Sequence, residues 1–428
     1  MLEPTSGMTS NQPVRACVSC KIQKRRCDKT FPACTYCTRL YWTVTDILFF
    51  ALEGMSYANT EVRVRRGGAT GQSLPNRYSM SPRAETSLLL LCVRLITQSH
   101  SAFVNVLPAQ TPEYLAAKRF YADVEAAGVN TIQVLQAAIL IALYELGHAI
   151  YPRAYLSIGV CVRYAIAFGF DGNGMTQGNM PYDWIEAEER KRAWWAVLII
   201  DRFVNLGTPT RQLVVEDPES TTILPMDDEA WDSGVQGSNE SFTLSSPSSL
   251  SMGRFARFAQ ATYLLGRVLR HTRDHTADAN FHEEEAVQLR RTLHALVNLA
   301  QVEERVRQLE FCTQISICYS ALLILGDPET VPSSENSIIE AIAKVACQIA
   351  KDFLLGLIVP LEKISPFMLH LIYHSAVIYM EINQETRSDE SAQALNHLKK
   401  TLRVVEKRWK AAGVYLEILK AREITHFT

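Results

Sequence analysis

No hydrophobic run in the sequence is long enough to cross a membrane. The most apolar stretches, residues 88–92, 134–143 and 196–200, are each interrupted by a charged residue soon afterwards, well short of the roughly 18 apolar residues that a membrane helix needs. The first 30 residues contain no apolar segment of the kind that a secretory signal requires. We therefore expect an intracellular protein without a membrane segment, in which clustered cysteines are metal ligands rather than disulfides.

Motifs of the common enzyme classes are also missing. The sequence has no GxSxG motif and no P-loop. Two histidine pairs have the spacing of metal ligands on one helix: His271 with His275, and His370 with His374. Neither pair has the glutamate that HExxH places after its first histidine. We interpret both pairs as ordinary surface or core histidines.

An aspartate-rich segment fits no metal-binding helix either. After Asp227 and Asp228, a third carboxylate is needed where Trp231 stands, and Asp232 comes one residue too late. Pro225 also indicates a loop at this point rather than a helix interior. An all-α enzyme is therefore the weakest functional alternative, and no catalytic residue is predicted.

The chain as a whole is not basic, which argues against a histone-like DNA binder. It has 43 Lys and Arg against 45 Asp and Glu, a formal net charge of −2. Residues 1–40 nevertheless hold seven basic residues against two acidic ones. A short basic head on a nearly neutral body is typical of a nucleic-acid reader that carries a separate regulatory domain.

Half of the ten cysteines crowd into one short segment with the spacing C-x2-C-x6-C-x6-C-x2-C; they are Cys17, Cys20, Cys27, Cys34 and Cys37. Thiolates two residues apart can bind one zinc ion at about 2.3 Å each, and a second pair completes a tetrahedral site. Because so short a segment has no hydrophobic core, the metal would supply its folding free energy. The spacing therefore predicts a structural zinc site.

The segment from Cys17 to Cys37 resembles most of the fungal six-cysteine binuclear zinc cluster of transcription regulators. Six thiolates hold two zinc ions in that family. The resemblance implies that Cys17 and Cys34 bridge the two ions, that Cys20 and Cys27 complete one of them, and that Cys37 serves the other.

Basic side chains between the second and third cysteines are the predicted DNA contacts. Lys24 matches the family lysine that reads guanine in a CGG triplet, and Lys21, Arg25 and Arg26 lie beside it. A short helix here would present Lys24 to the major groove, where guanine O6 and N7 accept hydrogen bonds. The neighbouring cations would contact phosphates without reading sequence. The resemblance thus implies a nuclear protein that binds double-stranded DNA and acts on the transcription machinery.

The family's sixth cysteine is missing. It corresponds to about residues 44–47, where this chain reads Val-Thr-Asp-Ile, and the next cysteine is Cys92. One zinc ion would still have four thiolates, whereas the second would have three plus water or Asp46. We therefore expect zinc as the cofactor, with one or two ions.

Three explanations of the missing cysteine stay open. The chain is a true five-cysteine variant with one zinc, or its cluster has decayed and it is a helical regulatory protein that does not bind DNA. In the third explanation, residues 41–52 are translated intron. The observation that suggests it is the apolar run YWTVTDILFFAL, which stands in place of the polar exit loop of the family.

The remaining sequence predicts an all-α protein. Residues 1–13 read as a disordered tail, 14–40 as the zinc cluster and 41–84 as a Gly- and Pro-containing linker, and residues 85–428 have helical periodicity. Predicted helices span 85–99, 112–126, 131–149, 152–168, 185–205, 252–274, 282–325 with a break, 336–357, 366–384 and 391–421.

Some helix ends can be predicted from local signals. Thr111 and Ser337 are expected N-caps, Pro112 occupies a first helical position, and Gly169 is an expected C-cap. No heptad series follows the cysteine cluster, so the sequence gives no coiled coil for a homodimer, a state that the resemblance leaves open.

Two segments resemble the fungal-specific regulatory domain that follows such zinc clusters. One is residues 159–170, which begins GVCVRYA; the other is residues 189–195, ERKRAWW, followed by Asp201-Arg202 and by LPMDD at 224–228. The family usually has Gly-Arg-Pro before this acidic loop, whereas this chain has Gly207-Thr208-Pro209. The resemblance spans about residues 110–232 and implies a regulator of RNA polymerase II promoters with CGG-type half-sites, with control of one metabolic or secondary-metabolite gene cluster as the expected role.

Overall fold

The structure is a computed structural model of the chain. It describes residues 84–97, 110–169, 184–233, 241–247, 252–274, 278–307, 312–326, 336–358 and 360–425. The predicted zinc cluster, with its candidate metal- and DNA-binding residues, lies outside the described residues.

The described part of the chain is helical, which confirms the all-α prediction. Its only strand-like contact is an isolated antiparallel bridge between Ile223 and Thr243. The helices are α4 (Ala84–Thr97), α5 (Pro112–Ala126), α6 (Ile132–Gly147), α7 (Arg153–Ala167), α8 (Trp184–Val204), α9 (Asp228–Ser233), α10 (Arg254–Arg273), α11 (Ala279–Arg307), α12 (Cys312–Leu325), α13 (Asn336–Leu354), the 3₁₀ helix η2 (Leu361–Lys363), α14 (Met368–Thr386), α15 (Asp389–Val405) and α16 (Ala411–Thr425).

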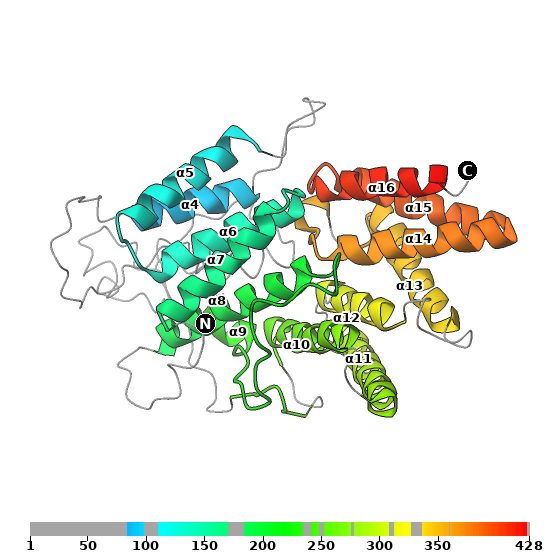
Figure 1. The fold of residues 1–428 in the computed structure, drawn as a ribbon, viewed down its shortest axis with the longest axis horizontal. Helices are drawn as coiled ribbons and strands as arrows, with labels where there is room; N and C mark the ends of the chain where they lie inside the picture. Colours follow the sequence, from blue (N-terminus) through cyan, green and yellow to red (C-terminus); the bar gives the residue numbers. More distant parts are fainter. Residues whose placement is uncertain are drawn as a thin grey trace, which may run out of the picture.

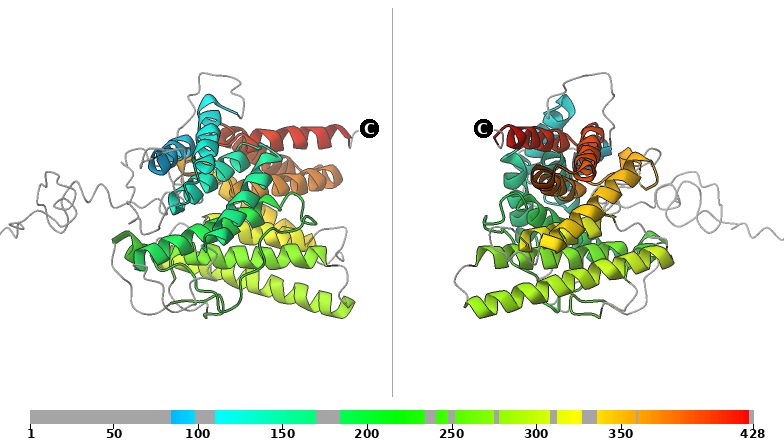
Figure 2. Two further views of the ribbon diagram at one scale, coloured as in Figure 1. Left: turned by 60° about the vertical axis from the view of Figure 1, so that its left-hand side comes forward. Right: turned by 90° about the vertical axis from the view of Figure 1, so that its right-hand side faces the viewer.

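The helices form three groups around a shared core. Helices α4 to α8 lie together on one side, α10 to α12 form the lower part, and α13 to α16 form the other side (Figure 1). Figure 2 shows α10 and α11 packed side by side along the base of the molecule. No helix in the described ranges has the length and apolar character needed to span a membrane.

Helix α6 lies at the centre of the first group and is buried on every side. Its sequence, IQVLQAAILIALYELG, leaves no polar face, and nearly every residue in it is buried. Helices α4, α5, α7 and α8 pack around it. The long apolar stretch at 134–143 is therefore part of the protein core, because a helix that is apolar all round must be covered on all sides.

One helix was predicted with wrong boundaries and another was not predicted. The helix expected at 391–421 is two helices, α15 and α16, which are separated by a turn at residues 406–410. This turn carries Trp409 into the core, where the indole Nε1 donates to the backbone oxygen of Ile364 at 2.8 Å. Helix α9 was missed, because Pro225 indicated a loop. The N-cap pattern was nevertheless there, since Asp227 Oδ1 accepts from the backbone N–H of Glu229 at 3.0 Å.

The predicted helix ends were partly right. Thr111 caps α5 as expected, and its hydroxyl accepts from the backbone N–H of Tyr114 at 3.2 Å. The C-cap of α7 is Phe168, one residue before the predicted Gly169, which follows it with a φ of +66°, the left-handed conformation that glycine adopts most readily. Ser337 is not an N-cap, because α13 already begins at Asn336.

A column of aromatic rings connects the first group of helices to the last. The rings of Tyr144 and His148 stack with centroids 3.9 Å apart, and Tyr114 stacks on the far side of Tyr144 at 5.4 Å. Trp409 packs edge-on against His148 at 5.6 Å. The indole also covers Gly147, where an added Cβ atom would lie 2.3 Å from Trp409 Cε3. Only glycine permits this contact.

We therefore expect Gly147→Ala to destabilise the protein by about 1–3 kcal/mol, because overpacking a filled core displaces its neighbours. Gly159→Ala in α7 is the matched control, since an added Cβ there meets no atom within 4 Å. That control should be neutral or stabilising by up to about 1 kcal/mol, as alanine favours helix. Urea denaturation of both variants measures the difference, and equal midpoints would contradict the assigned contact.

Candidate functional site

Two buried arginines on α8 organise the chain that follows this helix. Arg192 and Arg202 each have only 1% of their side-chain surface exposed. A guanidinium cannot be deprotonated in a protein, so each needs carboxylates and hydrogen-bond acceptors within the core. The segment between α8 and α9, residues 205–227, supplies many of these partners and is called the acidic loop.

Arg192 ties the end of the acidic loop to the first half of α8. Its Nε lies 3.1 Å from Glu188 Oε1, and its Nη2 lies 3.2 Å from Asp228 Oδ1 and donates to the backbone oxygen of Met226 at 3.0 Å. Glu188 also accepts from the Met226 N–H at 2.8 Å. The guanidinium lies over the ring of Trp231, 5.0 Å from its centroid. The LPMDD segment is thus held against the ERKRAWW segment.

Asp228 extends this network to the start of α10. Its second oxygen, Oδ2, accepts from the backbone N–H of Phe255 at 3.2 Å. A carboxylate is favoured there, because the N-terminus of a helix has free N–H groups and a positive dipole end. Gly253 leaves room for the contact, since a Cβ atom at this position would lie 2.7 Å from Asp228 Oδ2.

Arg202 holds the first half of the same loop. It pairs with Asp201, and its Nη2 contacts Asp217 Oδ1 at 3.1 Å and the Glu216 backbone oxygen at 3.0 Å. Arg270 of α10 lies on the other oxygen of Asp217 at 2.6 Å. Burial raises the pKa of the Asp201 carboxyl, while Arg202 and backbone N–H donors act in the opposite direction.

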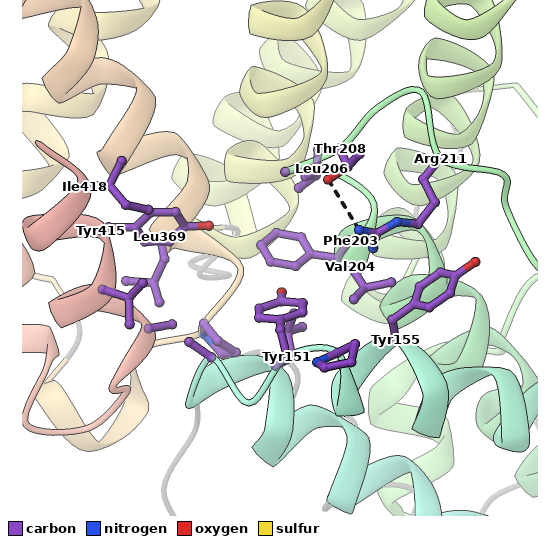
Figure 3. A pocket seen from close by; sticks show the side chains of 17 residues that line it. Tyr151, Tyr155, Phe203, Val204, Leu206, Thr208, Arg211, Leu369, Tyr415 and Ile418 are labelled. Carbon is purple, nitrogen blue, oxygen red and sulfur yellow. Dashed lines mark hydrogen bonds between the residues drawn. The ribbon is translucent and has the colours of Figure 1, made fainter. Parts of the chain in front are cut away.

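The loop that these ion pairs hold forms one wall of a cavity of about 650 Å³ (Figure 3). Phe203 and Val204 at the end of α8 line it, followed by Leu206, Thr208 and Arg211 in the loop. Asp201 fixes the far end of this wall, because its carboxylate accepts from the backbone N–H groups of residues 214 and 215 at 3.3 and 3.4 Å. The buried network therefore shapes the cavity.

The other walls come from distant parts of the chain. Tyr151 and Tyr155 project from the α6–α7 turn and from α7, while Leu369 of α14 and Tyr415 and Ile418 of α16 face them. Desolvation raises the pKa of Tyr151 to about 12, and Arg211 acts in the opposite direction. Burial likewise raises the pKa of Tyr415. Both phenols are therefore neutral at physiological pH and can donate hydrogen bonds.

The residues that raised the enzyme alternative have structural roles instead. Asp228 pairs with Arg192, as described above. His271 Nδ1 lies 3.0 Å from Glu285 Oε2, and its ring stacks on His282. Burial lowers the pKa of His370 well below the usual value, so this histidine is a neutral core residue. Within the ranges that the structure describes, no three His, Cys, Asp or Glu residues gather as a metal site.

Comparison with known proteins assigns this helical region to a family. The profile of the Fungal specific transcription factor domain matches residues 72–312, which is more than half of the chain and includes α8, the acidic loop and α10. The chain belongs to this family. The profile of the Fungal Zn(2)-Cys(6) binuclear cluster domain matches residues 15–43, the segment that holds all five clustered cysteines. Both are families of transcription factors, not of enzymes.

Curated relatives are fungal transcription factors as well. Transcription factor BOA15 of Botryotinia fuckeliana is 39% identical over 111 residues, 26% of this chain and 60% of the relative. Pigment biosynthesis transcriptional activator pigB of Monascus ruber is 30% identical over 122 residues, 26% of this chain and 22% of that protein. The matched region therefore spans less than two thirds of either relative. No solved structure gives a significant match.

The ERKRAWW and LPMDD segments therefore have a structural role in this chain, because their contacts hold the acidic loop in place. The cavity that the loop lines was not predicted, because its walls come together only in the folded chain. One hint of this region lay in the sequence. Thr208 stands where the family usually has the arginine of Gly-Arg-Pro, and it lies in the cavity wall.

We expect Arg202→Met to destabilise the protein by about 3–5 kcal/mol, because it leaves the carboxylate of Asp201 buried without its counterion. Adding Asp201→Asn should restore part of the loss. Lys420→Met is the control, since its ion pair with Glu417 is largely exposed and such pairs contribute about 1 kcal/mol or less. Urea midpoints test this, and a neutral Arg202→Met would show that the network does not hold the fold.

Proposed function

We propose that this chain is a zinc-dependent transcription regulator that reads CGG-type half-sites at RNA polymerase II promoters in the nucleus. The observation that carries the proposal is the order of two family matches in one chain, a zinc cluster at 15–43 followed by the regulatory domain at 72–312. The proposed division is a tail at 1–13, a DNA reader at 14–40, a linker at 41–84 and the helical domain at 85–428. The transcription machinery is the expected partner, and a homodimer stays an open alternative, because no heptad series follows the cysteine cluster.

The donor set of the cluster fits zinc. Cys17, Cys20, Cys27 and Cys34 supply four thiolates, which is a complete tetrahedral set for one ion. Cys37 and the two bridging thiolates of Cys17 and Cys34 supply three donors for a second ion, which leaves one position for water or a further side chain. We therefore propose that this donor set holds one zinc ion, and that a second ion binds only where a fourth donor is present.

The basic residues of the cluster have separate roles in the proposal. Lys24 donates to guanine and so carries sequence preference. Lys21, Arg25 and Arg26 contact phosphates and fix the register of the protein on the duplex. The local excess of positive charge in residues 1–40 supports this assignment, because phosphate neutralisation supplies much of the affinity for DNA.

Control of a single biosynthetic gene cluster is the proposed cellular role. The support comes from the relative in Monascus ruber, which is described as a transcriptional activator of pigment biosynthesis. The alternative is a regulator of the same ancestry whose incomplete cluster no longer binds DNA, and the absence of a cysteine between Cys37 and Cys92 is the observation that favours it.

We expect Lys24→Ala to weaken binding to a CGG duplex by about 1–3 kcal/mol and to relax the preference for that triplet. Arg25→Ala and Arg26→Ala are matched controls from the same segment, and they should weaken binding to all duplexes and reduce its salt dependence. Fluorescence anisotropy with cognate and scrambled duplexes at several salt concentrations separates the two effects. Equal losses on both duplexes would remove Lys24 from the base-reading role.

Zinc content measured on the same samples tests the alternative. One or two zinc ions per chain, together with duplex binding, support the proposed reader. A chain without zinc and without affinity for any duplex would overturn the proposal in favour of the regulator that does not bind DNA.

We also expect the mature transcript to differ from the printed sequence between about residue 41 and the early fifties. The zinc-cluster match ends at residue 43, just before the sixth cysteine is due. An evolved loss of one ligand would leave a recognisable exit loop around one substitution, whereas here an apolar run replaces the loop. Sequencing of reverse-transcribed mRNA should therefore reveal a transcript that restores a cysteine after Cys37. A transcript that encodes residues 41–52 as printed, with fewer than two zinc ions in the protein, would rule out a splicing origin.

A further inference from the structure

The cavity beside the acidic loop has the size of a small-molecule site. Its volume is about 650 Å³, within the range of roughly 300–1,000 Å³ that ligand pockets occupy. Its walls come from the α6–α7 turn, the end of α8 with its loop, α14 and α16. A molecule bound there would contact the first and the last group of helices at once.

The lining is apolar and aromatic, with one charge. The rings of Tyr151, Tyr155, Phe203 and Tyr415 line it (Figure 3). Arg211 is the only ionisable cation among the lining residues, and no carboxylate is among them. Aromatic rings provide flat apolar contact area at low entropic cost, and their faces and edges stack best on another planar ring system.

Arg211 lies in the cavity without a carboxylate partner among the described residues. Its guanidinium carbon lies over the ring of Tyr155, 4.6 Å from the centroid, and its Nη2 contacts the hydroxyl of Thr208 at 3.5 Å. The buried Arg192, Arg202 and Arg257 of the same domain each pair with a carboxylate. The difference leaves the donors of Arg211 available to an acceptor that enters the cavity.

We propose that this cavity binds a small planar aromatic carboxylate. The carboxylate lies against Arg211 and the Thr208 hydroxyl, because a guanidinium and a carboxylate form charge-assisted, often bidentate hydrogen bonds. The ring system lies between Phe203 and the tyrosines, whose neutral hydroxyl groups donate to further ligand oxygens. Leu369 and Ile418 cover its apolar edge from the side of α14 and α16.

The position of the cavity between two groups of helices couples ligand binding to the conformation of the regulatory domain. The Arg202 network holds the wall that carries Arg211, and Trp409 and Phe367 hold the opposite wall against the first group of helices. Ligand contacts to both walls therefore stabilise their present arrangement, since a ligand that binds only the native state raises its stability. Ligand binding in this cavity does not require that the chain bind DNA.

Calorimetric titration of the full chain with 2-naphthoate tests the proposal, with 2-naphthamide as the uncharged probe of the same shape. We expect saturable binding of 2-naphthoate, a rise in the unfolding temperature, and binding of the amide that is weaker on the order of tenfold. Arg211→Gln should remove the preference for the acid and leave the amide unaffected. Arg403→Gln, an exposed arginine on α15, should change neither.

A second variant keeps the proposal testable if Arg211→Gln folds poorly. Val414→Phe adds a ring at a lining position that is 47% exposed, so the fold can accept it, and it should abolish binding of both probes while the circular dichroism spectrum stays unchanged. Absence of 2-naphthoate binding to the native chain at millimolar concentration would overturn the proposal. Equal binding of acid and amide would overturn the role of Arg211, and unaltered binding to Val414→Phe would place the ligand elsewhere.

Discussion

The need to neutralise two buried guanidinium groups on α8 constrains much of this fold. Removing an ion from water costs several kcal/mol even after the protein relaxes, so Arg192 and Arg202 must have carboxylates beside them. Only a loop that returns to α8 can bring Asp217 and Asp228 there. The acidic loop therefore follows a path set by charge pairing, without a sheet or helix of its own along most of its length, and it also positions the start of α10.

Packing of Trp409 holds the C-terminal helices against the rest of the fold. Its indole fills the space over Gly147, completes the aromatic column of Tyr144 and His148, and donates to the backbone of Ile364. Such a residue joins two parts of the chain that are more than 250 positions apart. The loop and the tryptophan together produce the cavity, because each holds one of its walls in place.

The two proposed parts of the protein would be stabilised in different ways. The helical domain has a large apolar core, and a chain of this length can bury enough surface to fold on that basis. The cysteine segment has no such core, and in our proposal thiolate coordination supplies its folding free energy. Loss of one thiolate would therefore affect DNA binding without affecting the helical domain, which is why ancestry and DNA binding are separate questions for this chain.

Local spacing by itself determined the helical class, the N-cap at Thr111 and most helix boundaries, because a 3.6-residue period and a capping hydroxyl act within a few residues. Spacing also identified the five candidate zinc ligands, since two-residue chelation is a local property as well. Only the tertiary structure decided that a turn carries Trp409 into the core, that Arg202 meets Asp217, and that Arg211 lies over the ring of Tyr155 in a cavity wall. These outcomes depend on the free energy of filling and neutralising a shared core, and that energy exists only when distant segments have come together.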